Sequence, residues 1–136
     1  MRKDNRSNAV RFDASYQEIG RIGDPCAYCG VESDVYDHVP PLHYVSRLAE
    51  NDLNGSNLRK IPACTECNTA LNGLILITLK DRRKRIKEYL RKKYRSFLAM
   101  PKWDEDELAE LEPKFADEIR RASRYAEFIK TRVGFY

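Results

Sequence analysis

This sequence of 136 residues has no long apolar run, few histidines and a small net charge. No apolar run exceeds the four residues of Leu74–Ile77, which excludes a membrane-spanning helix. The polar start of the chain leads into no apolar segment, so we expect no secretory signal and a cytoplasmic protein without a membrane partner. The formal net charge is only +4, which is a weak indication of an acidic partner.

The remaining composition, with 42% hydrophobic and 34% charged residues, is typical of a folded globular chain of one domain. Its four cysteines form two C-x-x-C pairs, Cys26 with Cys29 and Cys64 with Cys67. In a reducing cytoplasm, two such pairs favour a tetrahedral zinc site over disulfides, and a redox pair would explain only one of them. Four thiolates leave no open coordination position, so this zinc is expected to be structural.

The 34 residues between the pairs carry polar side chains suited to phosphodiester chemistry. His38 could act as a general base, because imidazole titrates near neutral pH. Asp37 and Asn68 offer the oxygen ligands that Mg²⁺ or Mn²⁺ prefers. Asp37 precedes His38 on a predicted strand, and Asn68 follows Cys67, so a zinc knuckle would hold the start of a helix against that strand.

The order C-x-x-C, Asp37-His38-Val39-x-Pro, Asn57-Leu58, C-x-x-C-Asn68 resembles the HNH endonuclease family. Residues 64–73, CTECNTALNG, are particularly similar to the phage endonuclease VII branch, which resolves branched DNA. The resemblance covers roughly residues 24–75. It implies a small zinc-stabilised ββα-metal core, treble-clef-like. Together with the long C-terminal helices that apolar spacing predicts, the expected fold is α+β and mostly α.

This resemblance also implies roles for individual residues. Asp37 and Asn68 would bind a catalytic Mg²⁺ or Mn²⁺, His38 would be the general base, and Asn57 would orient that base. The implied reaction is hydrolysis of DNA to a 5′-phosphate and a 3′-hydroxyl, in a bacterial or phage-infected cell. Each site would cut one strand, so a duplex cut would need two sites.

Other interpretations of the same residues remain open. Asn57 could serve only a turn, Asn68 could only cap the following helix, and Asn72, one turn further on, is a rival cation ligand. His43 is interpreted as a surface or packing residue. Neighbouring residues on a strand face opposite sides, so Asp37 and His38 need a bend to face one ion, which the following Pro40-Pro41 makes plausible.

Apolar spacing outside this region predicts helices. We expect a short helix over 14–19, another over 41–49, and one long helix from Asn68 to before Pro101. Residues 80–95 contain ten Lys or Arg and two acidic residues, a net charge of +8, which favours contact with DNA phosphates over a merely solvated face. The predicted DNA-binding residues are Lys80, Arg82, Arg83, Lys84, Arg85, Lys87, Arg91, Lys92 and Lys93.

The region after Pro101 is acidic and helical in pattern. Residues 104–118 have a net charge of −7, and Asp104–Glu107 suits a helix N-terminus. An apolar seam continues to Val133, with Pro113 predicted to start a new helix or to kink the old one. The seam favours an intramolecular hairpin, with a homodimer interface as the alternative.

These patterns divide the chain into a basic N-terminal segment (1–24), a zinc-bound nuclease core (25–75) and a helical extension (76–136). The leading prediction is a metal-dependent HNH DNA endonuclease that acts on duplex or branched DNA. The first alternative is a non-catalytic, zinc-stabilised nucleic-acid-binding module in phage packaging or recombination. The second is an interaction protein whose acidic helices bind another protein.

Overall fold

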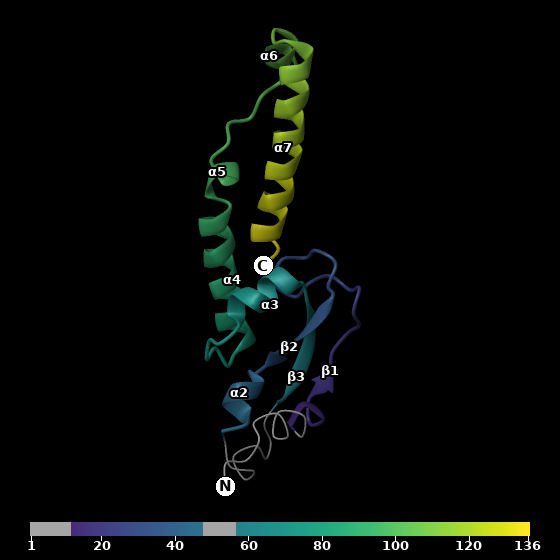
Figure 1. Cartoon of the computed structure of the whole chain (residues 1–136), viewed down its shortest axis with the longest axis vertical. Helices are drawn as coiled ribbons and strands as arrows, with labels where there is room; N and C mark the ends of the chain where they lie inside the picture. Colours follow the sequence, from purple (N-terminus) through teal and green to yellow (C-terminus); the bar gives the residue numbers. More distant parts are fainter. Residues whose placement is uncertain (1–11, 48–56) are drawn as a thin grey trace.

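The computed structural model describes residues 12–47 and 57–136, which fold into a mixed structure of helices and a small sheet (Figure 1). The sheet consists of β1 (Gln17–Glu18), β2 (Val35–Val39) and β3 (Arg59–Ala63). The labelled helices are α2 (Leu42–Val45), α3 (Thr65–Leu71), α4 (Leu79–Lys93), α5 (Arg95–Leu98), α6 (Glu105–Ala109) and α7 (Pro113–Val133). Two predictions fall partly outside the described residues: the first eleven residues of the basic N-terminal segment, and the end of the helix expected over 41–49.

The sheet has the order β1-β3-β2, with β3 in the centre. β2 runs antiparallel to β3 and places His38 opposite Lys60 and Asp37 opposite Ile61, so the predicted strand is confirmed. The short helix expected over 14–19 is wrong, because Gln17–Glu18 pair with β3 as a parallel strand. The partner strand supplies backbone hydrogen bonds that the local sequence pattern cannot reveal.

The long helix expected from Asn68 is also wrong. α3 begins at Thr65, where the Cys64 side chain accepts a hydrogen bond from the Cys67 amide, so Asn68 lies inside the helix and is not its cap. The helix stops at Leu71 because Asn72 is extended and Gly73 takes a left-handed conformation with φ of 79°. α4 then starts afresh at Thr78, whose hydroxyl accepts from the Asp81 amide.

The C-terminal helices fold back along the molecule as an intramolecular hairpin. α7 runs beside α4 and α5, and its C-terminal end lies close to α3 (Figure 1). The Asp104 carboxylate caps α6, as the acidic turn predicts, and Pro113 occupies the first turn of α7. The seam is largely buried within the chain, through residues that include Leu108, Ile119, Ala126, Ile129 and Val133.

One apolar core joins the sheet, the cysteines and the helical hairpin. Val39 and Ile61 of the sheet belong to the same buried cluster as Ile86 of α4 and Ile129 of α7. Packing in this core therefore crosses the boundary suggested at residue 75, and a second cluster, in which Phe12 packs with Leu58, crosses the one at residue 24. None of the helices within residues 12–47 and 57–136 has the length and apolar character that a membrane crossing requires.

Candidate functional site

The four cysteines converge on one buried point, as their spacing predicts. Their sulfur atoms all lie within 4.8 Å of one another, and every one of these residues is buried. The Sγ atoms of Cys29 and Cys64 are 3.7 Å apart. This matches the roughly 3.8 Å edge of a tetrahedron built on a Zn–S bond of about 2.3 Å. The cluster therefore fits a structural metal ion such as zinc.

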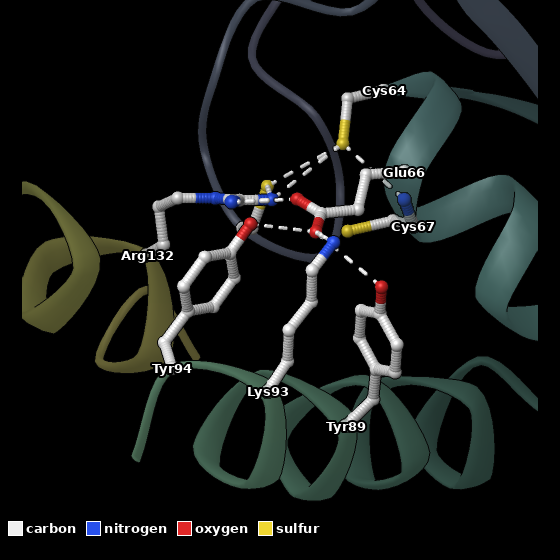
Figure 2. Close-up of polar contacts among 8 residues, drawn as sticks. Cys64, Glu66, Cys67, Tyr89, Lys93, Tyr94 and Arg132 are labelled. Atoms are coloured by element: carbon white, nitrogen blue, oxygen red, sulfur yellow. Dashed lines mark hydrogen bonds and ion pairs between the residues drawn. The ribbon is translucent and has the colours of Figure 1, made fainter. Parts of the chain in front are cut away.

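Arg132 of α7 lies against these sulfur atoms (Figure 2). Its Nη2 is 3.3 Å from Cys29 Sγ and 3.9 Å from Cys64 Sγ, and the side chain is almost entirely buried. A divalent ion held by four thiolates carries a net charge of about −2, so a buried guanidinium compensates part of it. The last turn of α7 thus contacts the cysteine cluster from outside through the Arg132 side chain.

Glu66, between the second pair of cysteines, connects Arg132 to α4 (Figure 2). Its carboxylate accepts from Arg132 Nη1 at 2.7 Å, Lys93 Nζ at 2.5 Å and the Tyr94 hydroxyl at 2.7 Å. Burial alone would raise the pKa of Glu66, but these hydrogen bonds outweigh it and lower the pKa to about 2. Glu66 is therefore ionised at neutral pH and ties α3, α4 and α7 together.

A second feature is a surface cleft of about 260 Å³, which shares helix α3 with the cysteine cluster. Asp37 and His38 of β2 line it together with Asn68 of α3, so three of the four predicted catalytic residues meet in one place. Asn72 also lines the cleft, which keeps it a rival to Asn68 as a ligand. Asn57 is exposed and does not line this cleft.

Asp37 is engaged by two partners at the wall of the cleft. Arg82 donates from Nε to Oδ2 at 3.0 Å and from Nη2 to Oδ1 at 2.7 Å, and the Tyr28 hydroxyl donates to Oδ2 as well. Both side chains of the ion pair are buried, with 3% and 5% exposed. Both oxygens of Asp37 already accept hydrogen bonds from a cationic partner, so a cation could use this carboxylate only in competition with Arg82.

Arg82 therefore differs from the other basic residues predicted to bind DNA. It is a buried partner of Asp37 and does not belong to an exposed cationic face, so the predicted contact with DNA along such a face does not extend to Arg82. The cause is position: Arg82 lies one helical turn before Ile86 and two before Leu90, on the face of α4 that packs into the core. Its guanidinium still borders the cleft.

The side chain of His38 contacts different residues from Asp37, on the opposite face of β2. Its Nε2 is 2.6 Å from Asp13 Oδ1, and its ring packs edge-on against Tyr16 with centroids 4.8 Å apart. The hydrogen bond with His38 lowers the pKa of Asp13, although burial opposes the shift. Asp37 and His38 thus contact different partners on opposite sides, as strand alternation predicts, and still border the same cleft.

His43 also lines the cleft, although its sequence context suggests only a surface or packing role. Its Nε2 is buried without a hydrogen-bond partner among the described residues. An imidazole nitrogen in that state is uncommon, since buried polar atoms are normally paired. His43 is therefore better described as a cleft residue with an unused donor or acceptor.

Six of the nine predicted DNA-binding residues have neither an ion pair nor a ring contact within the described part of the chain. Of the other three, Arg82 pairs with Asp37, Lys93 pairs with Glu66, and Arg83 lies over the Tyr136 ring at 3.5 Å. The six are Lys80, Lys84, Arg85, Lys87, Arg91 and Lys92. Spacings of four, three and four residues place Lys80, Lys84, Lys87 and Arg91 on one face, which we call the basic stripe.

Sequence reasoning missed four residues that contact the predicted site: Asp13, Tyr28, Glu66 and Arg132. Two of them had a detectable signal, since Tyr28 and Glu66 each lie inside a C-x-x-C pair. Asp13 and Arg132 had none, because their partners are distant in the chain. In comparisons with protein-family models, curated proteins and solved structures, no match to this chain was found.

Proposed function

We propose that the protein is an endonuclease of the HNH type, which hydrolyses phosphodiester bonds in DNA and has a ββα-metal core built from β2, β3 and α3. The observation that carries this proposal is the meeting of Asp37, His38 and Asn68 at one cleft, which shares α3 with the four-cysteine cluster. Zinc is the proposed ion of that cluster, because closed tetrahedral thiolate sites typically hold it.

In this proposal His38 accepts a proton from the attacking water. The water oxygen then bonds to phosphorus, the bond from phosphorus to the 3′-oxygen breaks, and the leaving oxygen takes a proton from solvent. The products are a 5′-phosphate and a 3′-hydroxyl. Arg82 borders the cleft and can donate hydrogen bonds to a phosphate bound there, because a guanidinium matches phosphate geometry.

Mg²⁺ or Mn²⁺ remains part of the proposal, with Asp37 and Asn68 as its oxygen ligands. When bound, such a cation supplies positive charge to the phosphate and the leaving oxygen. Asp37 becomes available only if Arg82 gives up its hydrogen bonds to that carboxylate. We therefore expect weak cation binding to the free protein, and tighter binding when a phosphate of the nucleic acid competes for Arg82.

Cleavage of plasmid DNA tests the proposal most directly. With Mg²⁺ or Mn²⁺, the purified protein should nick a supercoiled plasmid, and His38→Ala should lower the rate at least about 100-fold, the usual contribution of a general base. Metal content and thermal stability of the variant serve as controls for folding. Equal cleavage by His38→Ala would contradict the assigned base, and a panel of nicked, duplex, four-way-junction and RNA substrates would identify the preferred one.

A non-catalytic nucleic-acid-binding module is the second candidate. The specific observation in its favour is the buried ion pair between Arg82 and Asp37, which occupies the expected cation ligand. Salt-sensitive DNA binding without cleavage, across cations and substrates, would favour this candidate. A homodimer is a further proposal, which light scattering would test.

A further inference from the structure

Asp13 holds the imidazole of His38 from a segment that the nuclease motif does not include. The two residues are 25 positions apart in the chain, and their side-chain atoms Oδ1 and Nε2 are 2.6 Å apart. At this distance a charged carboxylate accepts a short, charge-assisted hydrogen bond from the imidazole N–H. In the neutral ring this contact places the proton on Nε2 and leaves Nδ1 with a free lone pair.

The segment that carries Asp13 is itself fixed at both ends. Phe12 and Tyr16 are buried in a cluster with Val45 and Leu58, on either side of Asp13. The backbone turns between them, with the Tyr16 amide donating to the Asp13 carbonyl at 3.0 Å. The Tyr16 hydroxyl also donates to the Pro40 carbonyl, directly after β2. This anchoring holds the backbone of Asp13 beside the His38 ring.

Other charged groups near Asp13 do not replace His38 as its main partner. Lys60 Nζ is 3.4 Å from Asp13 Oδ1, and it is also 3.7 Å from Glu18 Oε1. Lys60 therefore divides its charge between two carboxylates, whereas the shorter contact of Asp13 is with His38. Because Asp13 is 42% exposed, its ion pairs contribute little to folding stability. The main effect of the Asp13 carboxylate is therefore on the orientation of the His38 ring.

We propose that Asp13 is a positioning residue that fixes the tautomer and ring orientation of His38, with Nδ1 as the atom that accepts the proton from water. For its catalytic consequence this inference rests on the proposed nuclease function. A carboxylate that holds the distal nitrogen of a working imidazole also stabilises the imidazolium that forms when the proton arrives.

Nuclear magnetic resonance of the metal-loaded, ¹⁵N-labelled protein tests the geometry without any cleavage assay. The chain has only two histidines, so a His43→Gln variant assigns the His38 signals. At a pH where the imidazole is neutral, the wild type should show a protected Nε2–H proton on His38. Asp13→Ala should lose that signal to exchange with water. Glu18→Gln, which removes the other carboxylate beside Lys60, should keep it.

The cleavage rate provides the second readout. Asp13→Ala should lower kcat at least about 10-fold with little change in KM, since loss of a carboxylate that orients a catalytic imidazole costs up to about 10⁴-fold, and Asp13→Glu should restore part of it. A missing Nε2–H signal in the wild type, or an unchanged one in Asp13→Ala, would overturn the inference. If no protein cleaves DNA while the signals behave as expected, the function fails and the positioning of His38 stands.

Discussion

The ion pair between Arg82 and Asp37 controls whether Asp37 is available as a cation ligand. The carboxylate is buried beside a buried guanidinium, so each charge depends on the other for its solvation. A pair of this kind need not add stability, but the loss of one partner leaves an uncompensated charge in the interior.

We therefore predict that Arg82→Met lowers the free energy of unfolding by roughly 3–5 kcal/mol, measured by urea denaturation of the metal-loaded protein. Arg85→Met, at an exposed position on the same helix, should change it by less than about 0.5 kcal/mol. The double variant Asp37→Leu with Arg82→Met should recover part of the loss, because it removes both buried charges. Equal effects of Arg82→Met and Arg85→Met would show that the ion pair is not formed in solution.

Cation binding is a second consequence of the same pair. We predict that Mn²⁺ binds the free protein weakly and at least about tenfold more tightly in the presence of a short DNA duplex, followed by electron paramagnetic resonance. Linkage requires that Mn²⁺ strengthen DNA binding by the same factor. Asp37→Asn with the same duplex is the matched control, since it accounts for Mn²⁺ bound by DNA alone. An identical affinity with and without DNA would contradict the competition for Arg82.

At the scale of helices, α7 contributes to the cysteine cluster through Arg132. This residue reaches two sulfur atoms and Glu66 from the far end of the chain. Outer contacts of this kind set the affinity of a metal site, typically by 10- to 100-fold.

Arg132→Met should consequently lower the affinity for the structural metal by about 10- to 100-fold, measured by competition with a chromophoric chelator. The matched control is Arg124→Met, an exposed position on the same helix, which should leave the affinity unchanged. If both variants kept wild-type affinity, the guanidinium would be a packing residue and not part of the metal site.

The basic stripe of α4 makes a separate prediction about DNA. Each phosphate that the protein no longer neutralises should reduce the slope of log K against log salt by about 0.9. Replacing Lys80, Lys84, Lys87 and Arg91 with Gln should thus lower the slope by up to about 3 to 4 and weaken binding at low salt, whatever the DNA sequence. Replacing Lys102, Lys114, Arg121 and Arg124 with Gln removes the same charge elsewhere and should change the slope much less.

At the scale of the whole molecule, the cysteine cluster and the apolar core are one unit. The cysteines share a buried cluster with residues of the sheet, α4 and α7, so a metal bound by the four sulfur atoms would stabilise the contacts between all of them. Metal binding energy is then partly folding energy.

Removal of the metal with a chelator should lower Tm markedly. A loss of roughly 3 kcal/mol corresponds to about 10 °C for a chain of this size. Differential scanning calorimetry before chelation, after chelation and after re-addition of Zn²⁺ measures this effect. An unchanged Tm after complete metal removal would show that the core is stable without the ion.

The sequence by itself determined the features that depend on short spacing. The C-x-x-C pairs predict the sulfur cluster, the Asp37-His38 motif before Pro40 indicates β2, and Pro113 marks the start of α7. The break after α3 is also readable in principle, because Asn72-Gly73 is a helix stop signal well before Pro101.

Only the tertiary structure decided which groups surround the predicted site. Asp13 reaches His38, Arg82 reaches Asp37, and Arg132 reaches the sulfur atoms across separations of 25, 45 and 68 or more residues. Local patterns carry no information about such pairs, because they form only where packing of the core brings distant segments together. The sequence therefore predicts which residues have the chemistry of a site, and packing determines which of them are free to use it.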